Sequence, residues 1–301
     1  MKYFYYPGCS LEGSAREYDI STRAVMKALG ADLIEMEDWT CCGASAAEAR
    51  SYLLSLVLPA RNLALAAGSG VRADMLVPCS SCYMNLRKVD DHINRSGRTA
   101  DLVKEALETE GLRYNGGIKV RHLLDILAND AGPDTIEANV KRNLSGLKIA
   151  PYYGCQALRP YGDFDNPQQP VSMEPLIRAL GAEVHSWAMG AKCCGAGLMT
   201  TKKEIGLGLV ADILEAANGA DCIVTVCPMC QLNLEMCQGK ISRAEGKDLR
   251  ISILYLPQLI GLGLGLAESD LRLDFNLAFT PSFQKSVGFL SRKGTAGQAG
   301  A

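Results

Sequence analysis

The sequence has few histidines and no cluster of basic residues. Only 3 of its 301 residues are His, and the formal net charge is −2. A nucleic-acid-binding face needs clustered Lys and Arg, so binding to nucleic acid is not expected. His92, His122 and His185 stand alone in the sequence, which favours surface or core roles over catalysis.

A long hydrophobic run is also lacking. The longest one near the C-terminus, 251–267, is interrupted by one proline and three glycines, so no membrane span is expected. Its segment 260–266 is either ordinary core or an apolar docking surface for a partner. The opening residues, MKYFYYPGCS, do not resemble a signal peptide, which predicts a cytoplasmic protein. No Gly-x-Gly-x-x-Gly follows a predicted strand, so no dinucleotide site is expected.

Cysteine, in contrast, is abundant. Twelve residues are Cys, and ten of them form two arrays of five. The first array is Cys9, Cys41, Cys42, Cys79 and Cys82. The second is Cys155, Cys193, Cys194, Cys227 and Cys230. Each array consists of one cysteine, then a Cys-Cys-Gly, then a Cys-x-x-Cys, with similar gaps. In a reducing compartment this pattern indicates metal or redox chemistry, whereas Cys222 and Cys237, outside the repeat, are expected to be structural.

The repeat extends beyond the cysteines. A Tyr-Tyr pair precedes both Cys9 and Cys155, and Asn85 and Asn233 follow their Cys-x-x-Cys motifs at the same offset. We therefore predict a tandem duplication into two pseudo-symmetric domains whose sites face each other across the seam. The expected domains are 1–145 and 146–282, with a linker within 132–145 and a loose C-terminal tail over 283–301.

Each half shows the same alternation of strands and helices. Strands are expected over 2–6, 32–36, 75–77 and 118–120, and again over 147–153, 183–187, 222–226 and 251–255. Helical patterns separate them, which predicts an α/β fold with a mainly parallel sheet flanked by helices in each half. The cysteines then fall at the carboxyl ends of strands, where open α/β sheets bind ligands.

The cysteine chemistry favours a polynuclear metal centre. Thiolates are soft ligands that select zinc, Cu(I) or iron–sulfur clusters. Five thiolates exceed the four that tetrahedral zinc takes, although four-cysteine subsets leave zinc open as an alternative. Adjacent cysteines can bind one centre only if the chain bends sharply, and Gly43 supplies that freedom in the first array.

The doubled motif resembles the CCG domain found in the B subunit of heterodisulfide reductase and its relatives, over essentially the whole chain. The resemblance implies two CCG domains, each binding a noncubane [4Fe-4S] cluster through five cysteines, and a cavity between them in which a disulfide is cleaved to two thiols. It assigns cluster 1 to Cys9, Cys41, Cys42, Cys79 and Cys82. It assigns cluster 2 to Cys155, Cys193, Cys194, Cys227 and Cys230. The clusters would be the catalytic groups, with no acid or base residue assignable.

The resemblance also implies partners. This chain has no ferredoxin-type cysteine run, so electrons would come from a ferredoxin-like C subunit and, behind it, a flavin-containing A subunit. The substrate would be a small disulfide or thiol. Methanogen members often have His after the cysteine that opens the second array, where this chain has Gln156. An amide is no acid, so the chain is more similar to the bacterial relatives of the family.

Three function classes follow from this interpretation. The first is the catalytic subunit of a heterodisulfide reductase-like complex, working by one-electron steps in either direction. The second is an electron relay in a larger flavin-based oxidoreductase complex, with no disulfide substrate of its own. The third is a zinc-stabilised binding protein, which paired five-thiolate sites disfavour. The loop 159–170, which follows the opening of the second array, is either a plain surface loop or the rim of the cavity.

Overall fold

The computed structural model describes residues 1–44, 46–95 and 97–288 of the chain. It contains two four-stranded sheets, with strand orders β2-β1-β3-β4 and β6-β5-β7-β8. Every neighbouring pair in both sheets is parallel. Because the second order repeats the first with each strand number raised by four, the predicted α/β class and the duplication are both confirmed.

The elements of the first half follow the chain in this order: β1 (Lys2–Tyr5), α1 (Cys9–Glu12), α2 (Arg16–Ala28), β2 (Asp32–Glu35), α3 (Ala46–Arg50), α4 (Leu54–Gly68), β3 (Asp74–Val77), α5 (Ser80–Asn94), α6 (Arg98–Glu108), β4 (Val120–His122), α7 (Leu123–Ile126), η1 (Leu127–Ala131) and α8 (Gly132–Ala138). Those of the second half are β5 (Lys148–Tyr152), α9 (Glu174–Ala179), β6 (Glu183–Val184), η2 (Ala196–Leu198), α10 (Lys203–Ala216), β7 (Cys222–Thr225), α11 (Pro228–Glu245), β8 (Ser252–Tyr255), α12 (Leu256–Gly263), α13 (Glu268–Leu271), η3 (Leu273–Phe275) and α14 (Pro281–Ser286).

The central strands are buried on both faces. All four residues of β7 and all four of β8 are buried, as are the last three of β1. Parallel strands covered by helices read as continuous apolar runs, and these strands do. The strands β1, β3, β5 and β7 all end within four residues of an array cysteine. The prediction that the cysteines follow the carboxyl ends of strands is therefore confirmed for the opening cysteines and the Cys-x-x-Cys motifs, whereas the Cys-Cys-Gly motifs lie farther along the chain from the ends of β2 and β6.

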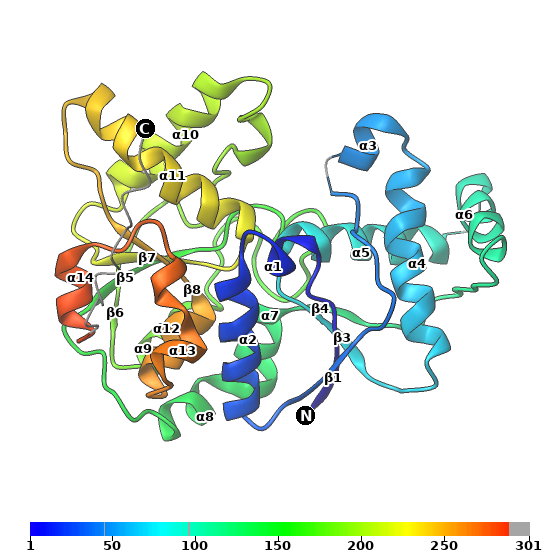
Figure 1. Ribbon diagram of the computed structural model, residues 1–301, viewed down its shortest axis with the longest axis horizontal. Helices are drawn as coiled ribbons and strands as arrows, with labels where there is room; N and C mark the ends of the chain where they lie inside the picture. Colours follow the sequence, from blue (N-terminus) through cyan, green and yellow to red (C-terminus); the bar gives the residue numbers. More distant parts are fainter. Residues whose placement is uncertain (45, 96, 289–301) are drawn as a thin grey trace, which may run out of the picture.

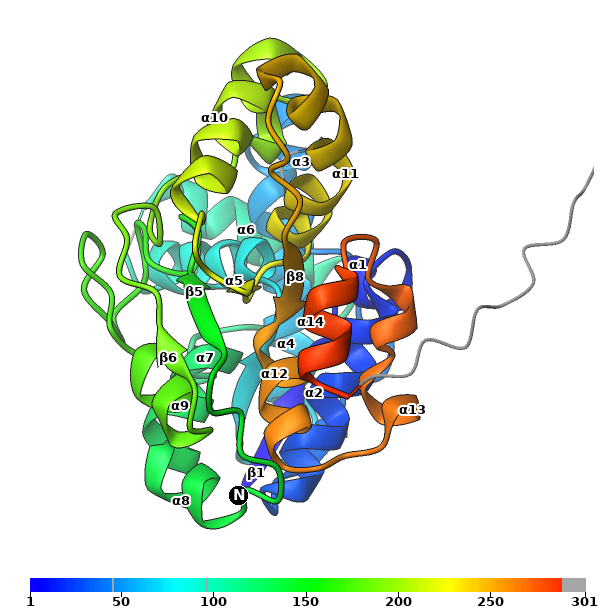
Figure 2. The same cartoon turned by 90° about the vertical axis from the view of Figure 1, so that its left-hand side faces the viewer.

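The two halves pack against each other over a wide seam. Helix α2 of the first half lies against α12 and α13 of the second, and α8 lies against α9 (Figures 1 and 2). One apolar core includes buried residues from both halves, such as Val25, Leu176 and Leu259. The segment 132–145, within which we predicted a linker, includes α8 with Ile136 buried, while most of its other residues are exposed. The domain bounds 1–145 and 146–282 stay a prediction.

Of the two alternatives for the segment 260–266, ordinary core and docking surface, the structure bears out the core. Ile260, Leu262 and Leu264 are at most 5% exposed. Within α12 the glycines permit close packing: a Cβ on Gly261 would lie 2.3 Å from Leu271, and one on Gly263 would lie 2.5 Å from Leu180. The alternation of Leu and Gly therefore lets side chains of neighbouring segments approach the α12 backbone.

Residues 283–288, which we assigned to the loose tail, are packed structure. They include the end of α14, and Phe283 and Val287 are each 1% exposed. The rest of the predicted tail, 289–301, lies outside the described residues. Within the part of the chain that the structure describes, no helix is both long enough and apolar enough to cross a membrane.

Candidate metal centres

The first cysteine array gathers at the carboxyl edge of the first sheet. Cys9 begins α1 just after β1, and Cys79 is the N-cap residue of α5 just after β3. The sulfur atoms of Cys9 and Cys41 lie 3.4 Å apart, and those of Cys42 and Cys82 lie 3.3 Å apart. Residues separated by up to 40 positions in the chain are thus brought into direct sulfur–sulfur contact.

The second array repeats this arrangement. Cys227 is the N-cap residue of α11, as Cys79 is of α5. The sulfur atoms of Cys194 and Cys230 lie 3.5 Å apart, which reproduces the contact between the equivalent cysteines of the first array. The duplication is therefore visible in the site itself and not only in the sheets.

Each array has a buried side and an open side. Cys9, Cys41 and Cys193 are exposed and Cys155 is half-buried. The buried sulfurs belong to Cys42, Cys79, Cys82, Cys194, Cys227 and Cys230. In both arrays, then, the Cys-x-x-Cys and the second cysteine of the Cys-Cys-Gly form the inner wall. The opening cysteine and the first of the Cys-Cys-Gly face outward, where a small molecule could approach.

The glycine of each Cys-Cys-Gly makes the sharp bend that we predicted. Gly43 and Gly195 both have φ of +72°, a conformation that favours glycine. Their backbone N–H groups donate to the sulfurs of Cys41 and Cys193, each at 3.4 Å. The bend therefore aims a hydrogen-bond donor at the first sulfur of each adjacent pair.

An asparagine one helical turn after each Cys-x-x-Cys holds the Cys-Cys-Gly loop in place. Asn85 Nδ2 donates to the carbonyl oxygen of Cys42 at 3.1 Å, and Asn233 Nδ2 donates to that of Cys194 at 2.7 Å. Both side chains are buried, at 6% and 7% exposed. The sequence indicated these two residues only as part of the repeat. The structure shows that each one binds the carbonyl oxygen of the second cysteine in its Cys-Cys-Gly.

The surroundings lower the pKa of two cysteines in each array, Cys41 and Cys79 in the first and Cys193 and Cys194 in the second, and the exposed one of each pair is the clearest case. Hydrogen bonds with the thiols of Cys42 and Cys9, followed by that from the Gly43 N–H, lower the pKa of Cys41. A hydrogen bond with the Cys155 thiol, and then the Gly195 N–H, lower the pKa of Cys193. A metal or cluster binds the thiolate, so both positions suit that ligation.

The donor set fits an iron–sulfur centre. In each array the candidate ligands are sulfurs, and a backbone N–H is aimed at one of them; such hydrogen bonds tune iron–sulfur centres. Among residues 1–44, 46–95 and 97–288, no three His, Cys, Asp or Glu side chains surround one metal-ion position. What the structure brings together is sulfur pairs. The assignment of five cysteines to each cluster stays a prediction, as does the zinc alternative.

Two residues at the seam, Tyr18 and Ser80, were not picked out by sequence reasoning, and a third, His122, was expected only in a surface or core role. All three are at most 1% exposed and are linked by hydrogen bonds where the halves meet. Ser80 Oγ donates to the carbonyl oxygen of Val226 at 3.1 Å, and Tyr18 Oη lies 3.3 Å from the same oxygen. None of the three has an identical counterpart in the other half, so the repeat could not reveal them. His122 is a core residue, as its isolation in the sequence predicted.

Gln156 and the loop that follows it also lie at the seam. Gln156 Oε1 accepts a hydrogen bond from Ser81 Oγ, which lies between Cys79 and Cys82. Farther along the loop, the ring of Phe164 stacks on that of His122 with centroids 6.1 Å apart. The loop 159–170 thus packs on the first half beside the first array and is not a plain surface loop, while its role as a cavity rim stays a prediction.

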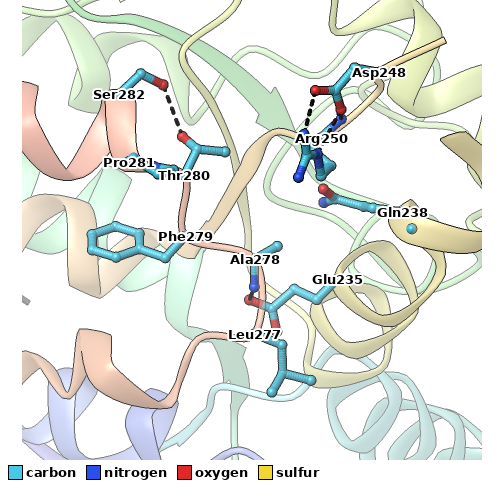
Figure 3. Close-up of a pocket in the computed structure, with 11 residues that line it drawn as sticks. Glu235, Gln238, Asp248, Arg250, Leu277, Ala278, Phe279, Thr280, Pro281 and Ser282 are labelled. Atoms are coloured by element: carbon cyan, nitrogen blue, oxygen red, sulfur yellow. Dashed lines mark hydrogen bonds and ion pairs between the residues drawn. The ribbon is translucent and has the colours of Figure 1, made fainter. Parts of the chain in front are cut away.

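A separate cavity of about 510 Å³ opens between α11 and the segment 277–282 (Figure 3). Its floor carries Glu235, whose Oε1 accepts hydrogen bonds from Gln231 Nε2 at 3.0 Å and Ala278 N–H at 3.3 Å. Burial raises the pKa of Glu235 to about 8. None of the residues described as lining this cavity is an array cysteine, so it is distinct from the candidate centres.

Comparison with known proteins identifies the family. The model of the CCG cysteine-rich domain matches residues 3–87 and again 149–235. The chain is 34% identical over 280 residues to the 8-methylmenaquinol:fumarate reductase membrane anchor subunit of Wolinella succinogenes, covering 92% of this chain and 96% of that relative. It is 32% identical to a protein of Archaeoglobus profundus named as similar to the B subunit of heterodisulfide reductase, covering 88% and 91%.

Two more distant matches extend the comparison. The B subunit of the ferredoxin/F420H2-dependent CoB-CoM heterodisulfide reductase of Methanosarcina acetivorans is 27% identical, with 89% of this chain covered and 91% of that one. The crystal structure of a hypothetical protein from Helicobacter pylori matches with a TM-score of 0.71 at 16% identity, over 93% of this chain and 52% of that one. This chain therefore spans about half of the solved chain, and at that identity the likeness shows the fold alone.

The named relatives are subunits of reductases, and with the cysteine arrays they support an iron–sulfur redox subunit. The predicted resemblance to the B subunit of heterodisulfide reductase is confirmed. Since both halves match its model, the chain belongs to the CCG cysteine-rich domain family.

Proposed function

We propose that this chain is the disulfide-acting subunit of a heterodisulfide reductase-like complex. In this proposal Cys9, Cys41, Cys42, Cys79 and Cys82 hold one noncubane [4Fe-4S] cluster. Cys155, Cys193, Cys194, Cys227 and Cys230 hold the other. The observation that carries the proposal is that both arrays, each with an open side, meet at one seam joined by the Ser80–Val226 hydrogen bond.

The overall reaction balances with two electrons and two protons. A disulfide R–S–S–R′ gains two electrons and two protons and gives two thiols, RSH and R′SH, or the reverse. Two such clusters, when bound, supply one-electron redox centres able to act on sulfur compounds. Cleavage of a disulfide needs two electrons, and two adjacent one-electron sites can supply them together. This favours a disulfide-acting subunit over an electron relay.

The protons would come from solvent at the open side of the arrays. His122 is fully buried, and burial lowers its pKa to about 4, so it stays neutral and enclosed near pH 7. The amide of Gln156 is no acid and its oxygen is engaged by Ser81. The outward-facing Cys9, Cys41 and Cys193 leave room for substrate and water together.

Electrons would come from outside the chain. We propose a ferredoxin-like C subunit as the direct partner, with a flavin-containing A subunit behind it. One reported relative is named as the B subunit of a heterodisulfide reductase and another as similar to that subunit, which supports an assembly of this kind.

A second candidate is an electron relay with no disulfide substrate. It is favoured by the 34% identity to a subunit of a fumarate reductase, a complex named for a quinol and a dicarboxylate. It is also favoured because the side chain of Gln156 is hydrogen-bonded to Ser81 and does not act as a proton donor to a disulfide. In this candidate the two sites pass single electrons between partners.

One experiment separates the two candidates. The anaerobically purified chain is titrated with small thiols and disulfides while its electron paramagnetic resonance is followed, with an alcohol analogue of the thiol as control. A new or shifted signal with the sulfur compound alone supports the disulfide-acting subunit. Unchanged signals at saturating thiol and disulfide support the relay.

A further inference from the structure

The two Cys-x-x-Cys loops differ in the pair of residues that they enclose. The first contains Ser80 and Ser81, and the second contains Pro228 and Met229 in the same positions. Serine hydroxyls can donate hydrogen bonds, whereas the proline and methionine side chains cannot. Any side-chain donor from one loop to the other half must therefore come from the first loop. Both serines are nearly fully buried, at 1% and 2% exposed.

Ser80 connects the first loop to the residue just before Cys227. Its Oγ lies 3.1 Å from the carbonyl oxygen of Val226 and 3.2 Å from His122 Nε2. His122 Nδ1 accepts from the N–H of Leu124 at 3.1 Å, so in the neutral ring the proton is on Nε2. Nε2–H therefore donates to Ser80 Oγ, and the single hydroxyl hydrogen of Ser80 is directed to Val226.

The hydroxyl of Tyr18 lies beside the same contact. Its hydroxyl lies 2.9 Å from the carbonyl oxygen of Pro78, which precedes Cys79, and 3.3 Å from that of Val226, which precedes Cys227. Its ring stacks on the ring of Tyr255 with centroids 4.1 Å apart and planes 3° apart. The hydroxyl thus spans the two equivalent positions of the duplicated fold, on a ring that is fixed by packing.

Ser81 supplies a second link to the other array. Its Oγ donates to Gln156 Oε1 and lies 3.5 Å from Met229 Sδ. Gln156 is bonded directly to Cys155, and Met229 lies between Cys227 and Cys230. The two serines of one loop therefore contact the neighbours of three cysteines of the other half.

We propose that Ser80 is the positioning residue that couples the two cysteine sites electronically. The path from Cys79 runs through the backbone to Ser80 Oγ–H, across one hydrogen bond to the carbonyl of Val226, and through the peptide bond to Cys227. It crosses a single noncovalent contact. This inference rests on the proposed function, because it requires both arrays to hold redox-active clusters.

The electron balance of the step is simple. A low-potential one-electron donor, such as a reduced ferredoxin-type protein, gives one electron to one site. That site then loses the electron as the other gains it, and the hydrogen of Ser80 stays on Oγ throughout. Ser80 neither donates a proton nor binds substrate. It sets how strongly the two sites interact.

The test uses the full anaerobic chain, reduced stepwise with dithionite, with iron content, circular dichroism and electron paramagnetic resonance recorded for each variant. Ser80→Ala is expected to keep the iron content and the signal of each site, but to reduce the magnetic splitting between the two sites several-fold. Ser80→Thr, which keeps the hydroxyl, is expected to restore the splitting. Ser252→Ala removes a buried hydroxyl that bonds Thr280, away from the seam, and is expected to match the parent.

Undiminished splitting in an iron-replete Ser80→Ala chain overturns the inference. If Ser80→Ala does not fold or lacks iron, Ser80→Gly decides, because it also removes the hydroxyl that donates to Val226. Weaker splitting in an iron-replete Ser80→Gly chain then supports the inference, and unchanged splitting overturns it. A parent chain that binds two clusters without interaction refutes the coupling alone, while a parent without two clusters refutes the proposed function.

Discussion

Asn233 donates a hydrogen bond from Nδ2 to the carbonyl oxygen of Cys194 at 2.7 Å, and so fixes the Cys-Cys-Gly loop to the helix that begins just after Cys227. Asn85 does the same for Cys42 at 3.1 Å. A contact that recurs at equivalent positions of two diverged halves joins the sheet-edge loop and the helix into one rigid site. It is the structural reason that both arrays keep their shape.

Asn233→Ala is expected to destabilise the fold and loosen the second site. The substitution leaves a buried carbonyl without its partner, which costs about 1–3 kcal/mol. Denaturant unfolding measures this cost, and iron analysis should show loss from one site. The control Asn139→Ala removes an exposed side chain that bonds the Thr135 carbonyl one turn earlier in the chain. It should change stability by less than about 0.5 kcal/mol, and an equal effect of the two variants would contradict the account.

Gly195→Ala is expected to damage the second site more than strain alone would. At φ of +72° a side chain costs about 1–3 kcal/mol. In addition, its Cβ would lie 2.9 Å from the Gly206 Cα. Gly30→Ala is the matched control, because Gly30 has φ of +73° and no atom within 4 Å of its Cβ position. The difference in free energy of unfolding between the variants isolates the contact, and iron should be lost only from Gly195→Ala.

Glu235→Gln is expected to raise stability above neutral pH. Desolvation raises the pKa of Glu235 from its ordinary value of 4.5 to about 8. The folded chain thus holds this proton between those values while the unfolded chain releases it. The contribution of the neutral carboxyl to the free energy of unfolding is fully present below pH 4.5. As the pH rises toward about 8, the free energy of unfolding falls by up to about 1.4 kcal/mol per pH unit.

Thermal unfolding from about pH 4 to about pH 9 tests this assignment. The parent chain should lose stability through the window between about 4.5 and about 8. Glu235→Gln, which has no titrating group at this position, should show a flatter profile. The same slope in both chains would show that the carboxyl of Glu235 does not titrate in this way.

Cys42→Ser is expected to lower the iron content of the first site alone, and Cys194→Ser that of the second alone. Each array is complete within its own half, and the contacts of Cys42 and Cys194 are to Cys82 and Cys230 of the same arrays. Cys237→Ala should leave iron unchanged because that residue lies outside the repeat. Equal loss from both sites in Cys42→Ser would indicate shared ligation or a collapsed fold.

The arrays and the fold class were predictable because a duplicated sequence marks its own equivalent positions. Cysteines, the asparagine after each Cys-x-x-Cys and the strand order all recur, so each half predicted the other. The seam was not predictable in this way. Ser80, Tyr18 and His122 have no identical counterparts, and only tertiary packing brings Ser80 and Tyr18 to Val226 and His122 to Ser80.

The segment 260–266 shows a different limit of sequence reasoning. Its alternating Leu and Gly were compatible both with a smooth exposed face and with a segment of the core. The choice depends on neighbours distant in the chain, since Leu180 and Leu271 approach the glycines of α12. The same applies to 283–288, whose small polar composition indicated a tail although Phe283 reaches the core.

The central claim is that the chain holds two clusters, one in each array, and metal analysis of the anaerobically purified protein tests it most directly. The account predicts about eight irons and eight acid-labile sulfides per chain, with little zinc. Iron sufficient for only one cluster, together with zinc near one per chain, would contradict it.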